Sequence, residues 1–350
     1  MSLFLLELLP VCTAMFYYVI WRFFVIFGNN SKLVPLIIAI ILACYVIFTF
    51  MYQWDSKVLD ILSTVSSWVF VLWFILFIIL LIEHTIPFKV NPWIIVWIIV
   101  LILWTWVYCS LHTKITNLNI QSDKIQKDSK ILLVSDIHVE NVTQNFHVNK
   151  ILKTIEQEKP DLVIIAWDLM NKANSQYPYY LKWFKSVKNT PIFAVIWNHD
   201  VMWNGTIVND IPKNSGIVLL NNAVTKNDSL NIQIAGIIDK SIWKDKSLDE
   251  IMNEVNFDNS KDWFTILVTH QPIKLEKLEN YPIDLEVAWH THRGQFYWIM
   301  ELSRIANDYL YWEYKYWDRT AFVTQWIWTW WLPFRLWTQS EMVIINLTKK

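Results

Sequence analysis

Residues 131–138 read Ile-Leu-Leu-Val-Ser-Asp-Ile-His. A short apolar run of this kind, rich in β-branched residues and followed by polar ones, predicts a buried strand. Side chains alternate along an extended segment, so Asp136 and His138 lie on one face and can reach the same ion. The stretch therefore predicts a strand that ends in a pair of metal-binding side chains.

Similar runs recur along the rest of the chain, at 162–166, 192–196, 217–220, 232–238, 264–269 and 285–288. Helical patterns at 148–158 and 179–187 lie between the early runs. Strands alternating with helices, each strand apolar throughout, are typical of an α/β domain with buried sheets. The roughly 240 residues after position 110 are enough to bury such a core.

Polar side chains that bind metals follow five of these strands. They are Asp136 and His138 after the first run, Asp168 after the second, Asn198, His199 and Asp200 after the third, His270 after the run 264–269, and His290 and His292 after the last. Ligands of α/β sheets bind at the carboxyl ends of strands. Carboxylate and amide oxygens suit hard divalent ions, and imidazole suits first-row transition metals. The pattern predicts a two-metal centre of the kind that clamps a phosphoryl group.

The ordered motifs resemble those of the calcineurin-like metallophosphoesterases, over roughly residues 130–346. This resemblance implies a four-layer α/β/β/α sandwich and two divalent ions (Mn, Fe or Zn). It implies that one ion is held by Asp136, His138, Asp168 and His292, and the other by Asp168, Asn198, His270 and His290. Residues 333–336, Pro-Phe-Arg-Leu, are typical of the membrane-linked branch of the family.

The resemblance also implies roles for residues that bind no metal. His199 would face the phosphate, stabilise the transition state and donate a proton to the leaving group, with Asp200 orienting it. Arg293 and Arg335 are weaker candidates for contacts with substrate phosphate, because surface salt bridges would explain them equally well.

Tryptophan stands where this family has glycine in three motifs, at Trp167, Trp197 and Trp289. The chain has 23 Trp and only 5 Gly, whereas glycine alone is usually about 7% of a protein. We hypothesise that UGA codons, read as glycine in the source organism, are written here as Trp. The alternative is a genuinely Trp-rich protein with a crowded site, because an indole at these turns would press on the ligands.

Residues 1–110 carry only 8 of the 61 charged residues. Four apolar stretches, near 3–27, 33–52, 63–82 and 92–110, each approach the ~20 residues that cross a bilayer. We therefore expect a four-helix membrane anchor over 1–111, a linker over 112–129 and the catalytic domain over 130–350. The distribution of lysines favours a multi-pass cell-membrane protein with its domain on the cytoplasmic side.

The predicted function is metal-dependent hydrolysis of a phosphodiester or phosphomonoester at the membrane. The anchor suggests a lipid-linked phosphate among the substrates that remain open. The alternative is a membrane sensor or scaffold whose phosphoesterase-like domain is catalytically impaired. A transporter is disfavoured by an expected lack of ion pairs among the apolar helices. The net charge of −1 gives no basic surface for nucleic acid, and three cysteines do not make a disulfide scaffold.

Overall fold

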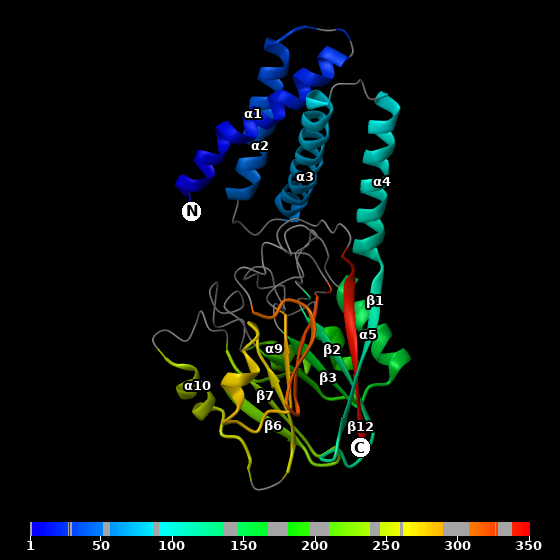
Figure 1. Ribbon diagram of the computed structural model, residues 1–350, viewed down its shortest axis with the longest axis vertical. Coiled ribbons are helices and arrows are strands. Elements are labelled where there is room, and N and C mark those ends of the chain that lie inside the picture. Colours follow the sequence, from blue (N-terminus) through cyan, green and yellow to red (C-terminus); the bar gives the residue numbers. More distant parts are fainter. Residues whose placement is uncertain are drawn as a thin grey trace. The chain divides into compact units, whose positions relative to one another are not determined.

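The computed structural model describes residues 2–26, 28, 30–51, 57–86, 91–135, 137, 146–166, 181–195, 210–238, 246–259, 262–289, 308–325, 327 and 338–350. The chain divides into two compact units, the first made of residues up to Tyr108 and the second beginning at Cys109. Figure 1 shows helices in the first unit and strands with shorter helices in the second.

The first unit is built from apolar helices. They are α1 (Ser2–Ile26), α2 (Leu33–Met51), α3 (Lys57–Thr85) and α4 (Pro92–Leu111), the last of which continues into the second unit. Among the described residues, two segments are long and apolar enough to cross a membrane, Leu9–Ile26 and Ile61–Thr85. The apolar runs of α2 and α4 are shorter. Large apolar side chains on these helices, such as Ile41 and Trp97, are well exposed.

An ion pair joins two of these helices, so the expectation that none would occur was wrong. Arg22 of α1 donates to Glu83 of α3, with 2.7 Å between Nη2 and Oε2. The Tyr18 hydroxyl lies 3.0 Å from His84 Nδ1 beside this pair. The residues are more than sixty positions apart, so only the packing of α1 against α3 reveals the pair.

The second unit contains two six-stranded mixed sheets. The first sheet has the order β1-β12-β2-β3-β4-β5 and the second β10-β11-β9-β8-β7-β6. The strands of the first are β1 (Thr113–Ser122), β2 (Ser129–Ser135), β3 (Leu162–Ala166), β4 (Ile192–Val195), β5 (Val218–Leu219) and β12 (Ser340–Lys349). Those of the second are β6 (Ala223–Asn227), β7 (Ile232–Gly236), β8 (Phe264–Val268), β9 (Leu285–Ala288), β10 (Trp312–Tyr316) and β11 (Arg319–Val323).

The two sheets pack face to face and helices cover their outer faces. One core lies between the sheets and includes Leu133 of the first sheet and Ile266 of the second. The outer face of the first sheet packs against α5 (Phe146–Glu158), η1 (Leu181–Ser186) and α9 (Asp210–Ser215). The outer face of the second packs against α10 (Leu248–Glu254) and η3 (Leu275–Leu278). This gives the helix–sheet–sheet–helix order that we expected.

The region expected to be a linker, 112–129, contains strand β1. It pairs in parallel with β12 over ten residues, from Thr113 opposite Ser340 to Ser122 opposite Lys349. As the outermost strand of its sheet, β1 has a mostly exposed, polar sequence in which Thr116 and Leu118 are buried. An apolar run therefore does not mark it. The second expected helix, 179–187, is a 3₁₀ helix over its described part.

Candidate metal centre

Three parallel strands of the first sheet end at one level. Ser135, the last residue of β2, lies opposite Ala166, the last of β3, and Ala166 lies opposite Val195, the last of β4. The residues that follow in sequence are Asp136, Trp167-Asp168 and the segment that contains Asn198. The register therefore brings the starting points of three predicted ligand segments to one edge of the sheet.

The second sheet presents a matching edge at the ends of β8 and β9. The Thr269 amide donates to the Val287 carbonyl at 3.0 Å, and the Trp289 amide donates to the His270 carbonyl at 3.2 Å. The pairing of the two strands thus continues beyond their last residues. His270 is 2% exposed and lies immediately beside the residue that precedes His290.

The two edges lie next to each other. Gly236 ends β7, and a Cβ built there would lie 2.7 Å from Val195 Cγ2 and 2.8 Å from the Leu220 carbonyl oxygen. Only a glycine allows β7 and β4 to approach this closely. The Ile327 amide, beyond β11, donates to the Ser135 carbonyl of β2 at 3.2 Å. The carboxyl ends of both sheets therefore meet where the sequence predicts the metal centre.

Of the seven predicted ligands, His270 is the one that the structure describes. The other predicted site residues lie outside the described residues: Asp136, His138, Asp168, Asn198, His199, Asp200, His290, His292, Arg293 and Arg335. Within the described ranges, no group of three or more His, Cys, Asp or Glu is arranged to hold an ion. The buried His270 imidazole at the shared edge is suited to bind a metal ion. The other predicted ligands are Asp, Asn and His residues, whose oxygen and nitrogen donors suit divalent ions.

Trp289 occupies the core beside His270. Its indole is fully buried between the sheets and its ring centroid lies 5.6 Å from that of His270, at an interplanar angle of 73°. Trp289 is not among the described residues with positive φ, so its backbone conformation does not by itself require glycine. The indole and the imidazole are in ordinary edge-to-face contact, so Trp289 lies against a predicted ligand.

A buried carboxylate in β9 was not identified from the sequence. Glu286 is completely buried, and burial raises the pKa of its carboxyl group to about 8. Its Oε1 accepts hydrogen bonds from Thr269 Oγ1 at 2.9 Å and from the Ile273 amide at 2.7 Å. The signal that could have indicated it is a single charged residue inside the apolar run 285–288.

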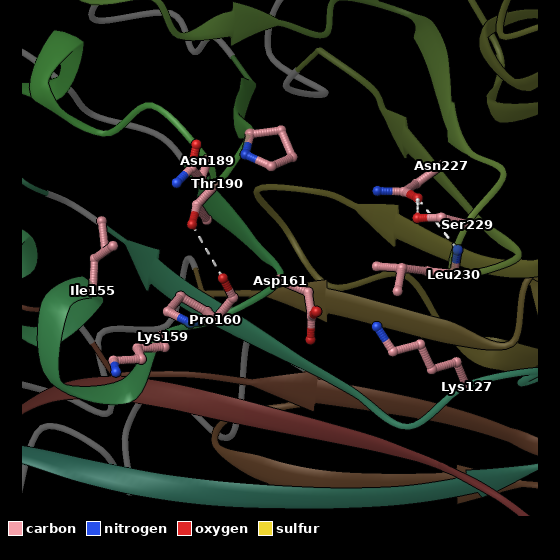
Figure 2. A pocket seen from close by; sticks show the side chains of 11 residues that line it. Lys127, Ile155, Lys159, Pro160, Asp161, Asn189, Thr190, Asn227, Ser229 and Leu230 are labelled. Atoms are coloured by element: carbon pink, nitrogen blue, oxygen red, sulfur yellow. Dashed lines mark hydrogen bonds between the residues drawn. The ribbon is translucent and has the colours of Figure 1, made fainter.

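A pocket of about 530 Å³ opens at the opposite edge of the strands (Figure 2). Its lining includes Lys127, Asp161, Thr190 and Ser229, which stand at or before the amino ends of β2, β3, β4 and β7. Its polar groups bond one another, as when Thr190 donates to the Pro160 carbonyl. This pocket is therefore separate from the edge that carries His270.

Comparisons with known proteins agree with this architecture. Residues 129–294 match the family model described as calcineurin-like phosphoesterase. An uncharacterized metallophosphoesterase of Helicobacter pylori is 27% identical over 251 residues, which cover 71% of this chain and 67% of the relative. The UDP-2,3-diacylglucosamine pyrophosphatase of Chlamydia trachomatis is 23% identical over 212 residues, covering 47% of this chain and 64% of that protein.

Among solved structures, a calcineurin-like phosphoesterase from Bacillus subtilis aligns with a TM-score of 0.33 and 14% identity, covering 47% of this chain and 72% of that one. This score is too low to support an argument about the site. The family match and the sequence relatives coincide with the two-sheet unit and with the ordered motifs at its strand ends. The chain therefore contains a calcineurin-like metallophosphoesterase domain.

Proposed function

We propose that this chain is a membrane-anchored phosphoesterase with a binuclear metal centre. The observation that carries the proposal is the meeting of the carboxyl ends of β2, β3 and β4 with the edge that holds His270. Two divalent ions, when bound, supply charge stabilisation and an activated water. The chain's own residues would hold the ions and the phosphate in position.

In this proposal the two ion sites share Asp168. Asp136, His138 and His292 complete one site, and Asn198, His270 and His290 complete the other. His199 donates a proton to the leaving-group oxygen, and Asp200 holds its ring in the required orientation. Arg293 and Arg335 are proposed to contact the substrate phosphate with their planar guanidinium groups.

We further propose that α1 to α4 form a four-span anchor in the cell membrane, with the domain on the cytoplasmic side. Two apolar segments of sufficient length and the exposed apolar side chains of α2 and α4 support a lipid surround. The bilayer would then be the first partner of the chain. The orientation rests on the lysines that follow α4 in sequence, which include Lys114 and Lys124.

The substrate proposed is a lipid-linked phosphodiester or pyrophosphate. Strand β1 begins one residue after α4 ends. It runs parallel to β12, which runs antiparallel to β2, so the chain enters the first sheet at the level where β2 ends. A membrane helix joined to the domain by so short a connection would raise the effective concentration of the domain toward lipid phosphates. The Chlamydia relative, a pyrophosphatase of a diacylated sugar nucleotide by its name, supports this substrate class.

The second candidate function is a sensor or scaffold that binds without turnover. The burial of Trp289 against His270 favours it. If the indole is present in the native protein, it occupies space beside a ligand that both hydrolysis and tight metal binding would require.

The test uses the full chain purified in detergent. We expect Mn²⁺-dependent hydrolysis of bis(p-nitrophenyl) phosphate that EDTA removes, and a decrease of about 10³-fold or more in Asp168→Asn. The rate should be much higher in the variant with glycine at 167, 197 and 289. Lack of metal-dependent hydrolysis in both proteins would favour the sensor. Far faster turnover of a soluble nucleotide than of any lipid phosphate would contradict the lipid-linked substrate.

A further inference from the structure

We propose that Glu286 is a positioning residue that fixes the His270 loop, defined here as residues 269–273, for metal binding. The inference rests on the proposed function, because it gives His270 the role of a ligand. It concerns a residue outside the predicted ligand set. Glu286 reaches the loop from the neighbouring strand and meets it at both ends.

Glu286 contacts residues on both sides of His270 in the sequence. Its Oε1 accepts from the Thr269 hydroxyl on one side of His270 and from the Ile273 amide on the other. The His270 carbonyl of the loop is also bonded, since it accepts from the amide of Trp289, the residue that follows β9. Four hydrogen bonds with β9 and the residue after it, including that from the Thr269 amide to the Val287 carbonyl, therefore hold the backbone that carries the imidazole.

Burial makes these contacts persistent. Glu286 and Thr269 are 0% and 1% exposed, so water does not compete for the hydrogen bonds. Glu286 Oε2 has no hydrogen-bond partner among the described residues. Burying a carboxyl group with one oxygen unpaired is costly. A hydrophobic residue would pack here at lower cost, so the contacts with the loop are the evident benefit of a carboxyl group.

The mechanism of positioning is indirect. Residues that hydrogen-bond to metal ligands without binding the metal themselves typically change metal affinity about 10–100-fold when they are removed. Glu286 acts in this way on the loop backbone rather than on the imidazole itself. The loop stays in place with any residue that offers one acceptor at the Oε1 position.

The experiment compares Glu286→Gln, which keeps that acceptor, with Glu286→Leu, which removes it, in the full chain in detergent. Mn²⁺ affinity is measured by calorimetric titration, and amide exchange of the loop by hydrogen–deuterium mass spectrometry. We expect Leu to weaken Mn²⁺ binding about 10–100-fold and to speed exchange at Ile273. Gln should remain within about threefold of the unsubstituted chain in both measurements.

Asp284→Leu is the matched control. Asp284 is a largely buried carboxylate just before β9 that bonds Lys124 and the Thr265 amide, at the end of the strand away from the loop. Its loss should lower stability without faster exchange at Ile273. If Glu286→Leu does not fold, Thr269→Val removes one of the two contacts and should weaken Mn²⁺ binding in the same direction.

The outcomes separate the two proposals. Unchanged exchange at Ile273 and unchanged Mn²⁺ affinity in a folded Glu286→Leu protein would overturn the positioning role while leaving the proposed function intact. If the unsubstituted and glycine-containing chains bind no Mn²⁺, the proposed function fails and the role in metal binding fails with it. The exchange result then shows whether Glu286 holds the loop for a purely structural reason.

Discussion

Trp312 and Trp317 have backbone conformations that favour glycine. Their φ angles are +80° and +55°, in the left-handed region that bulky residues rarely adopt. Trp317 is 88% exposed, so its ring gains little packing in return. These positions are independent of the three motif positions that first suggested glycine. They support the same hypothesis on conformational grounds rather than on family resemblance.

The first residue-scale prediction is that Trp317→Gly stabilises the chain. Relief of the left-handed strain should raise the free energy of unfolding by about 1 kcal/mol. Thermal unfolding followed by circular dichroism in one detergent measures the change. Trp183→Gly is the control, since Trp183 is also exposed but lies in η1 without positive φ. Equal destabilisation by both substitutions would contradict the argument.

The second prediction concerns the native protein. A peptide covering Val287 to Arg293, isolated from the source organism, should have the mass expected for glycine at position 289. The physical reason is the contact between the Trp289 and His270 rings, which glycine would remove. Tandem mass spectrometry gives the answer directly. Tryptophan at 289 would make the sensor or scaffold the leading function.

The third prediction follows from the raised pKa of Glu286, about 8 against an ordinary value of 4.5. Between these values the unfolded chain releases its proton while the folded chain keeps it. The free energy of unfolding should therefore fall as pH rises from 4.5 to 8, by at most about 1.4 kcal/mol per pH unit. Above pH 8 this contribution is constant.

Glu286→Gln tests that pH dependence. The amide cannot ionise, so the variant should gain stability relative to the unsubstituted chain as pH rises from 5 to 8, with little difference near pH 4. Thermal unfolding at several pH values measures the gain. If the stability of the two proteins changes with pH in the same way, Glu286 titrates near its ordinary pKa.

The sequence proposes candidate ligands because they lie shortly after apolar strands, and of these His270, just after β8, is the one within the described residues. Their supporting partners could not be predicted in this way. Glu286 meets Thr269 only because β9 pairs with β8. Glu341 accepts from Thr116 and Thr324, which come from different sheets. Contacts of this kind form only when strands distant in the sequence meet in the folded chain. A local sequence pattern therefore cannot predict them.

At the scale of elements, the sequence predicted the buried strands β2, β3, β4, β7, β8 and β9 but not the buried strands β11 and β12. The expected runs 162–166 and 285–288 coincide with β3 and β9. The edge strands β1 and β6 were not predicted, because their sequences mix polar with apolar residues, whereas the edge strand β5 lies within the expected run 217–220. Apolar runs indicate strands that are buried on both faces. An edge strand exposes one side, and its sequence resembles that of a linker.

The fourth prediction belongs to this scale and concerns the contact between β7 and β4. Gly236→Ala should lower the free energy of unfolding by about 1–3 kcal/mol, because the new methyl group overlaps Val195 and Leu220. Gly216→Ala is the control. It has no atom within 4 Å of a built Cβ but a φ of +76°, so strain alone should cost about 1 kcal/mol. Thermal unfolding again measures both, and a loss well below about 1 kcal/mol in Gly236→Ala would contradict the steric contact between the sheets.

At the scale of the whole molecule, the fifth prediction tests the anchor. The full chain should stay in the membrane fraction after an alkaline carbonate wash and be released by detergent, because the apolar faces of its helices are exposed. Residues 112–350 alone should stay in solution, since this part contains the three cores around the two sheets. Release of the full chain by carbonate would contradict the anchor.

The place of β12 has a consequence for how the domain is synthesised. Residues 340–349 lie between β1 and β2 in the first sheet, although about 200 residues separate them from those strands in sequence. Pairing across so long a separation is slow. The apolar helices emerge from the ribosome first, and the sheet cannot close until β12 follows. Closure of this sheet therefore has to wait until β12 has left the ribosome, and a ribosome stalled before residue 340 would leave β1 and β2 unjoined.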